Sequence, residues 1–191
     1  MIHLLDWLGA ILDLTSTILF ALASLWAWPI GIIAILINAC LYYKSLLFAD
    51  FSLQFIYLGL MAYGWHYWLN QQQQVPRPIR HITPSEICYT IPLTALGTAF
   101  IYVLLSRFTP STTPSLDALT TGLSLLAQWL LSRKVIETWF VWFVVDAVYS
   151  GLYLIKGIPV HGIECLIYLM IAIIGYYRWA SIKSTPRVIT T

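Results

Sequence analysis

The sequence predicts an all-α membrane protein with seven transmembrane helices, in which two parallel three-helix repeats are joined by a linking helix (3+1+3). Three observations predict this fold, namely an apolar composition, an internal repeat and seven apolar segments. Hydrophobic residues make up 60% of the chain and charged residues 9%, whereas soluble domains carry about 25% charged residues. Because the surface of a soluble domain of 191 residues must be largely polar, we expect an integral membrane protein.

The internal repeat has an offset of 111 positions, which aligns residues 5–68 with residues 116–179 without a gap. Fourteen of these 64 pairs are identical, against about five or six expected by chance in a chain so rich in Leu and Ile. The leucine pairs therefore carry little weight. The pairs that carry the match are Asp6/Asp117, Trp28/Trp139, Tyr42/Tyr153, Tyr57/Tyr168, Gly64/Gly175 and Trp68/Trp179.

A membrane span needs about 20 mostly apolar residues, and seven segments approach this length. They are residues 4–25, 29–45, 50–69, 87–105, 116–132, 138–155 and 160–178. The first segment lacks a basic leader and a small-residue cleavage site, so we expect it to remain as a membrane helix. Pro29 suits the first turn of the second segment, where no amide donor is lost.

The fourth segment lies between two breaks in the apolar pattern. Residues 71–86 are rich in Gln and Pro and cannot build a packed core, so we expect a solvated connector. Pro110 and Pro114 interrupt the chain after the fourth segment. The last three segments repeat the first three at the 111-residue offset.

Four units follow from these boundaries. Residues 1–70 form the first three-helix repeat, and residues 71–115 hold the connector and the linking helix. Residues 116–180 form the second repeat, and residues 181–191 form a tail. Because the second repeat begins four spans after the first, both repeats point the same way across the membrane. Transporters with parallel repeats have a symmetry axis along the membrane normal and a pathway between the repeats.

The basic residues predict the orientation of the chain. One side of the membrane receives Arg77, Arg80, Arg133, Lys134, Arg178, Lys183 and Arg187, and the other receives Lys44, Arg107 and Lys156. Cytoplasmic loops carry the excess of Lys and Arg. We therefore expect the C-terminus in the cytoplasm and the N-terminus outside.

Polar side chains inside a span are costly and usually face a cavity or a partner. The five that stand out are Asp13, Asn38, Gln54, Asp146 and Glu164. For Asp13 and Glu164 a structural role, held by hydroxyl groups of neighbouring helices, is an equal alternative. Asp50 and His161 are equivalent positions at the outer ends of their spans, where a solvated cap explains them as well as a function does.

Trp139, Trp142 and Asp146 share one face of the sixth span. Tyr149 and Tyr153 continue the same stripe. Aromatic faces attract cations by about 2 kcal/mol or more once water is excluded, and a carboxylate would offset the lost hydration. This stripe suits a flat cation.

Two other patterns bear on this site. On the second span Asn38 and Tyr42 are one turn apart. Tryptophans near helix ends also form interfacial belts. A belt position is the favoured interpretation for Trp26, Trp28 and Trp68. For Trp139 a belt position and a place in a substrate pocket are equally favoured. Trp142 lies one turn deeper, which favours a place in the pocket.

Several functions are excluded by what the chain lacks. It has no GxSxG, HExxH or P-loop motif. None of its four histidines has a second histidine at metal-ligand spacing. Its three cysteines lie in apolar segments without a CxxC pair, and its basic residues form no patch. We therefore expect no enzyme activity, no metal, no cofactor and no nucleic-acid partner.

Two stretches of this chain resemble the Pnu family of bacterial vitamin transporters. Residues 28–68 contain a WP opening, an ADFSLQ run and a YGWHYW ending, and residues 139–179 contain WFVWFVVD, GLYLIKG and IGYYRW. The resemblance implies a multi-pass protein of the bacterial inner membrane with a 3+1+3 fold similar in plan to the SWEET sugar transporters. It also implies facilitated diffusion of an unphosphorylated vitamin that a cytoplasmic kinase then traps. Nicotinamide riboside is the best-known substrate, and relatives carry thiamine, riboflavin or deoxynucleosides.

The resemblance also implies where the substrate binds. Matching the family's motifs carries its site over to Trp139, Trp142, Asp146 and Gln54. This sequence departs from the family at His161 and Glu164, and at Ala34, where an amide is expected and Asn38 follows one turn later. The complete set expected to bind substrate is Gln54, Asn38, Tyr42, Trp139, Trp142, Asp146, Tyr153 and Glu164.

We expect a cationic vitamin, with nicotinamide riboside first and thiamine as the alternative. A proton-coupled transporter, in which Asp13, Asp146 and Glu164 form a relay, is a second hypothesis. A membrane receptor that binds a ligand without moving it is a third. The sequence leaves open whether the chain forms a homo-oligomer in the bilayer.

Overall fold

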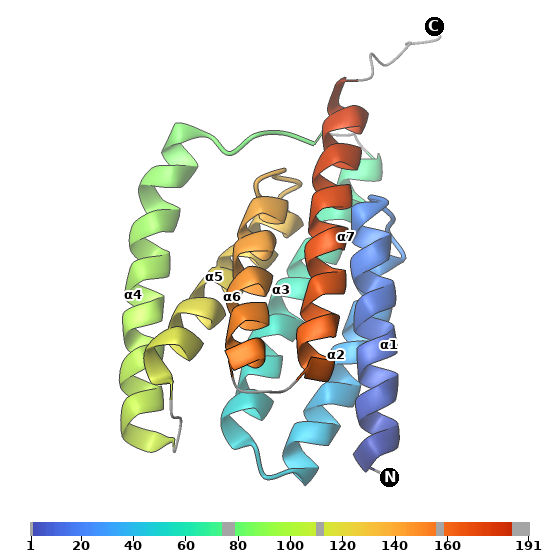
Figure 1. Ribbon diagram of the computed structural model, residues 1–191. Helices are drawn as coiled ribbons and strands as arrows, with labels where there is room; N and C mark the ends of the chain where they lie inside the picture. The colour runs from blue at the N-terminus through green and yellow to red at the C-terminus, as the bar shows by residue number, and fades with distance from the viewer. Residues whose placement is uncertain (1, 74–78, 110–112, 156–158, 185–191) are drawn as a thin grey trace, which may run out of the picture.

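The computed structural model describes residues 2–73, 79–109, 113–155 and 159–184, and within these ranges the chain forms seven α-helices (Figure 1). The helices are α1 (Ile2–Ala21), α2 (Ala27–Lys44), α3 (Phe48–Gln73), α4 (Pro84–Phe108), α5 (Pro114–Ser132), α6 (Thr138–Ile155) and α7 (Pro159–Ser184). Each predicted span coincides with one helix. The helices α3 and α7 continue a turn or more beyond the predicted ends.

Four helices in the described part of the chain are long and apolar enough to cross a membrane. They are α1, α2, α4 and the part of α7 from Cys165 to Lys183. The outer surface of α4 is strongly apolar, since Leu93, Leu96 and Phe100 are each more than 60% exposed. Such a surface is suited to acyl chains and not to water.

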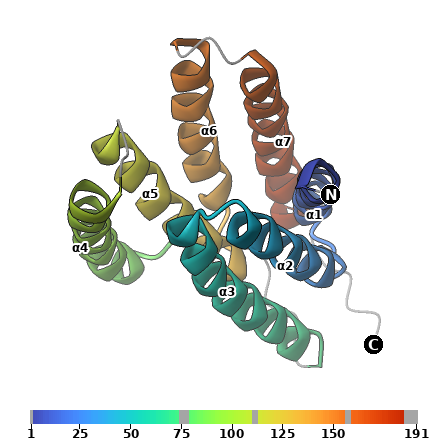
Figure 2. The same cartoon turned by 90° about the horizontal axis from the view of Figure 1, so that it is seen from below.

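The helix contacts follow the internal repeat. The helix α2 packs against α1 and α3, and α6 packs against α5 and α7. The two groups meet where α3 contacts α5 and where α1 contacts α7. At the 111-residue offset α1 corresponds to α5 and α3 corresponds to α7, so these two contacts are equivalent. Among the described helices, α4 packs against α5 alone and lies outside the other six (Figure 2).

Equivalent turns have equivalent backbones. Ala23, between α1 and α2, has φ 53°, and Lys134, between α5 and α6, has φ 56°; these residues are 111 positions apart. A positive φ is uncommon outside glycine. The same pair of positions is joined by a hydrogen bond in each group, with donor and acceptor exchanged, since Ser16 Oγ donates to the carbonyl of Ala27 and Thr138 Oγ1 donates to the carbonyl of Ala127, at 2.9 and 2.8 Å. The two groups of helices therefore share local structure as well as packing.

Four tryptophans close the bundle at one end. Trp28, Trp68, Trp139 and Trp179 are each at most 2% exposed. Neighbouring rings meet at 5.4 Å (Trp28 and Trp68), 5.5 Å (Trp139 and Trp179) and 6.2 Å (Trp68 and Trp179) between centroids. Large aromatic side chains dominate the energy of such buried clusters. We call these four residues the tryptophan cluster.

Two hydrogen bonds cross between the two groups of helices within this cluster. Trp68 Nε1 on α3 donates to the carbonyl of Ser132 at the end of α5, at 3.1 Å. Trp179 Nε1 on α7 donates to the carbonyl of Phe20 at the end of α1, at 3.0 Å. The donors are equivalent under the offset, and each bond satisfies a carbonyl at a helix end that lacks an intrahelical partner.

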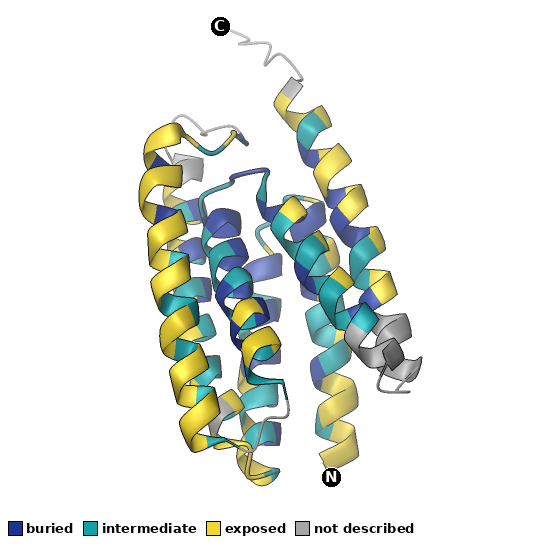
Figure 3. Cartoon of the chain, turned by 60° about the vertical axis from the view of Figure 1, so that its left-hand side comes forward, coloured by how far each residue is buried: buried dark blue, intermediate teal, exposed yellow. Residues whose placement is uncertain are grey.

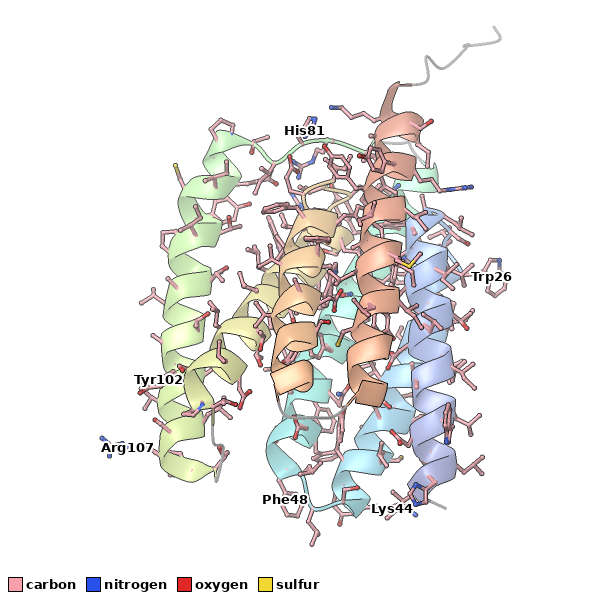
Figure 4. The ribbon with its side chains drawn as sticks, viewed as in Figure 1. Trp26, Lys44, Phe48, His81, Tyr102 and Arg107 are labelled. Atoms are coloured by element: carbon pink, nitrogen blue, oxygen red, sulfur yellow. The ribbon has the colours of Figure 1, made fainter. Side chains whose placement is uncertain are left out.

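The interfacial-belt interpretation of Trp28 and Trp68 is wrong, because both side chains lie in the core. Trp26 is 71% exposed and points away from the bundle, as a belt residue would (Figure 4). Two glycines admit the buried rings. A Cβ at Gly64 would collide with the Trp28 ring, and a Cβ at Gly175 would lie 2.7 Å from Trp139 Cδ2.

The expectation of a solvated connector is wrong for Ile79 and Arg80. The Ile79 side chain is buried at 5% exposure. Arg80 N donates to the carbonyl of Lys134 at 3.0 Å, and Ile136 N donates to the carbonyl of Arg80 at 2.9 Å. Backbone pairing therefore fastens the connector to the turn between α5 and α6.

Side chains reinforce this attachment. Arg80 Nη1 lies 2.6 Å from Glu86 Oε2, and this bond raises the pKa of the Arg80 guanidinium. Glu86 also completes a capping box with Thr83 at the start of α4. His81 Nδ1 lies 2.7 Å from Glu137 Oε1, at the opposite end of the bundle from Lys44 and Arg107 (Figure 4).

Replacing Gly64 by Ala tests the packing of the cluster. We expect Gly64→Ala to destabilise the protein by about 1–3 kcal/mol, because the new methyl group overpacks a filled core. The measurement is thermal unfolding in detergent. Gly59→Ala is the matched control on α3, since a Cβ there meets no atom within 4 Å, and helix propensity makes that change neutral or stabilising. Equal melting temperatures for the two variants would contradict this packing.

Candidate functional site

A cavity of about 320 Å³ lies between α1, α2, α3, α5, α6 and α7. Twelve of its lining residues form six pairs at the 111-residue offset. These pairs are Thr17/Gln128, Phe20/Leu131, Gly31/Trp142, Ile35/Asp146, Tyr57/Tyr168 and Met61/Ala172. The cavity is therefore built by equivalent positions of the two repeats, although most of the paired residue types differ.

The cavity is closed at the end that holds the tryptophan cluster. Phe20 and Trp139, which line it there, are 6% and 2% exposed. Asp13, Asn38 and Gln54 lie farther from the cluster and are half-buried. Across the molecule, buried residues face the interior of the bundle and exposed residues its outer surface (Figure 3). Among these lining residues, those near the cluster are thus the more deeply buried.

The structure brings six of the eight predicted site residues together. Asn38 and Tyr42 on α2, Gln54 on α3, and Trp139, Trp142 and Asp146 on α6 all line the cavity. The side chains of Tyr153 and Glu164 lie outside the described residues, as does that of His161. Asp50 lies in the first turn of α3, is exposed and does not line the cavity.

Asp146 is the charged group of the α6 stripe. Its side chain is half-buried, and among the described residues we find no hydrogen-bond donor or cation bound to its carboxylate. Among the described residues that line the cavity there is no Lys or Arg. Burying an ionised carboxylate without a partner is unfavourable, and Trp142, one turn earlier, supplies an aromatic face beside it. This part of the cavity is therefore suited to a cation.

Asp13 differs from Asp146 because it has a clear partner. Asn38 Nδ2 donates to Asp13 Oδ2 at 2.7 Å. Gly9 makes room for this pair, since a Cβ at position 9 would collide with Asn38 Oδ1. Asp13 therefore joins α1 to α2 and also lines the cavity, so both alternatives weighed for it from the sequence have support.

The sequence analysis missed several lining residues, of which Gln128, Tyr57 and Tyr168 had a visible signal. Gln128 is an amide inside the fifth span, the same signal that identified Gln54. Tyr57 and Tyr168 are an identical pair of the repeat. Met61 carries no polar signal and lines the cavity because it packs over Gly31.

The arrangement can bind a molecule, and we find no catalytic chemistry in it. Among the described residues, no group of three His, Cys, Asp or Glu side chains could hold a metal ion. The cavity offers aromatic rings, amides, hydroxyls and two carboxylates. Such a lining is typical of a site that recognises an organic molecule with a charged and a polar part.

Comparisons with known proteins agree with a transport role. The family model described as nicotinamide mononucleotide transporter matches residues 3–181. The chain is 20% identical over 204 residues to the nicotinamide riboside transporter PnuC of Escherichia coli, covering 92% of this chain and 85% of that protein. It is 27% identical over 179 residues to the riboflavin/roseoflavin transporter RibM of Streptomyces davaonensis, covering 91% and 83%.

A solved structure shows the same fold. The crystal structure of the vitamin B3 transporter PnuC superposes with a TM-score of 0.72 and 18% identity, covering 93% of this chain and 81% of that chain.

Replacing each cavity carboxylate by its amide tests their different roles. We expect Asp146→Asn to stabilise the ligand-free protein by about 1 kcal/mol, or about 2–4 °C, because it removes a partly buried charge that has no partner among the described residues. Asp13→Asn, the matched control, should not stabilise, because the bond from Asn38 would then reach a neutral amide oxygen and lose its charge assistance. Thermal unfolding of both variants is the measurement. If Asp146→Asn is as destabilising as Asp13→Asn, Asp146 is structural.

Proposed function

The chain belongs to the nicotinamide mononucleotide transporter family, the Pnu family that its motifs resemble, and we propose that it carries a flat cationic vitamin. Like its relatives PnuC and RibM, it is a vitamin transporter and not an enzyme. The first candidate substrate is nicotinamide riboside. One observation carries the proposal, namely that the carboxylate of Asp146 and the ring of Trp142 line the same cavity, with no Lys or Arg among its described lining residues.

The chemistry of the substrate fits this observation. Nicotinamide riboside contains a pyridinium ring and thiamine a thiazolium ring, so both are flat cations that also carry hydroxyl groups. The Trp142 ring would attract the cation, and Asp146 would replace part of the hydration that the cation loses. The half-buried Asn38 and Gln54 line the same cavity and are suited to hydroxyl groups.

We further propose a 3+1+3 architecture similar in plan to the SWEET transporters. The repeats are residues 1–70 and 116–180, residues 71–115 hold the connector and linking helix, and residues 181–191 form the tail. The α1–α7 and α3–α5 contacts are equivalent at the 111-residue offset, which supports this architecture. So do the paired bonds from Trp68 and Trp179.

The mode of transport is proposed to be facilitated diffusion across the bacterial inner membrane. The N-terminus would lie outside and the C-terminus in the cytoplasm, so that the tryptophan cluster closes the cytoplasmic end. A cytoplasmic kinase that phosphorylates the vitamin would then trap it, because uniport alone only equalises the two concentrations.

Two alternatives have a specific observation in their favour. The identity to RibM is higher than that to PnuC, which favours riboflavin, but a neutral ring does not use the charge of Asp146. Asp13 and Asp146 line the same cavity, which favours proton coupling. Proton uptake that depends on substrate would support the coupled mechanism, and thiamine remains the alternative cation. A receptor that binds without transport has no such observation.

Reconstituted protein should equilibrate labelled nicotinamide riboside, or thiamine, across vesicles without ATP or an ion gradient. Flux should not depend on an imposed pH gradient, and enclosing a vitamin kinase with ATP should make uptake exceed equilibrium. The measurement is internal label against time. Folded protein that moves neither vitamin would contradict the proposal, and flux that requires a pH gradient would favour the coupled alternative.

Trp142→Ala should weaken binding of the transported cation by about 30-fold, the equivalent of the roughly 2 kcal/mol of a desolvated cation–π contact. Titration calorimetry measures the affinity. Trp26→Ala is the control, because Trp26 is 71% exposed and lies outside the cavity. Equal losses in the two variants would reject the assignment of Trp142 to the site.

A further inference from the structure

We propose that Gln128 determines substrate specificity at the closed end of the cavity. Its side-chain amide would pair through two hydrogen bonds with a ring edge that carries a donor and an acceptor next to each other. This inference rests on the proposed function, because it concerns the same cavity and the same cationic vitamins. It adds which part of the vitamin lies deepest and which residue recognises it.

The position of Gln128 makes it the innermost amide of the cavity. It lies on α5 one turn before that helix ends at Ser132, and it lines the cavity together with Leu131. Leu131 belongs to the same buried core as Trp68 and Trp139. The Gln128 side chain is 7% exposed, whereas Gln54 and Asn38 are half-buried. A ligand that enters from the end opposite the tryptophan cluster would reach Gln128 last.

The hydrogen bonding of Gln128 within the described part of the protein is incomplete. Its Nε2 donates to the thioether sulfur of Met61 at 2.9 Å, and sulfur is a weak acceptor. Among the described residues, we find no donor bonded to its Oε1. Buried amides are normally fully paired, because an unpaired buried polar group is unfavourable. Gln128 therefore offers a donor held by a weak acceptor and an acceptor that is not used.

Met61 can give way to a better acceptor. Methionine is flexible, with three rotatable side-chain bonds, and the missing side chain at Gly31 makes room for the Met61 methyl group. A carbonyl or ring nitrogen of the ligand would replace the sulfur as the partner of Nε2. Met61 thus occupies a position that the ligand would take.

The second repeat alone supplies this group. The equivalent of Gln128 is Thr17, whose hydroxyl donates to the carbonyl of Asp13 in its own helix at 2.8 Å. Trp142 and Asp146 are also contributed by the second repeat, and their equivalents Gly31 and Ile35 cannot bind a cation. Since α5 packs against α6, a ring held by Trp142 would present its edge to α5. This asymmetry sets one orientation of the ligand, in which its ring lies deepest in the cavity.

Two cationic vitamins carry the required edge. The carboxamide of nicotinamide has an N–H donor beside a carbonyl acceptor, and the aminopyrimidine of thiamine has an N–H donor beside a ring nitrogen. The shared chemistry is an adjacent donor and acceptor on a planar group. Each vitamin has an analogue in which the pairing is lost, namely pyridinium riboside, which lacks the carboxamide, and 4′-deaminothiamine, in which hydrogen replaces the amino group of the pyrimidine.

Titration calorimetry with the full chain in lipid nanodiscs tests the inference. For whichever vitamin binds, the unmodified protein should bind it at least tenfold more tightly than its analogue. Gln128→Met keeps the length of the side chain and removes the amide, and it should bind vitamin and analogue within threefold of one another. Thr17→Val, the control at the equivalent position, should change both affinities by the same factor.

The outcomes separate this inference from the proposed function. If the unmodified protein binds neither cation, the proposed function fails and the inference fails with it. If it binds a vitamin and its analogue equally, or if Gln128→Met keeps the preference, only the role of Gln128 is overturned. Should Gln128→Met not fold, the comparison of ligands on the unmodified protein still decides, and Gln128→Glu provides a second variant of the same length.

Discussion

The cross-bonded tryptophan cluster is the interaction on which the rest of this structure depends. In a bilayer, apolar helices gain little from meeting one another, because lipid is as apolar as their side chains, so packing and internal hydrogen bonds must hold them. Here Trp68 and Trp179 each donate to a carbonyl on the opposite group of helices, and their rings fill the space between the groups. This joins the two groups at one end, and the cavity lies between the two groups beside this junction.

Within that cavity the two repeats share positions but not chemistry. Gly31 and Ile35 lie where the other repeat has Trp142 and Asp146. Gly31 and Ile35 leave room for a ligand, whereas the indole ring of Trp142 and the carboxylate of Asp146 would recognise it. The proposed pathway between the repeats would need matching backbones, and the equivalent turns at Ala23 and Lys134 agree with it. Binding an asymmetric molecule needs different side chains, which explains why most of the lining pairs differ.

Much of this could be predicted from the sequence, for identifiable reasons. The seven helices follow from the lengths of the apolar segments, and six site residues follow from the cost of polar groups in lipid and from the family's motifs. Trp28 and Trp68 were assigned to the interface because a tryptophan near a helix end satisfies a belt as well as a core. Their burial depends on Gly64 and Ser132, which lie far along the chain. Gln128 was missed although it is an amide within a span, and the docking of Arg80 on the α5–α6 turn depends on backbone pairing that composition does not encode.

The central claim is that the cavity between the repeats accepts a flat cation. A thermal-stability screen with nicotinamide riboside, thiamine, riboflavin and neutral nucleosides tests it most directly. A ligand at 100 times its dissociation constant stabilises a protein by about 2.7 kcal/mol. We expect at least one of the two cationic vitamins to raise the melting temperature and the neutral compounds to leave it unchanged. Stabilisation by riboflavin or a nucleoside alone would contradict the claim.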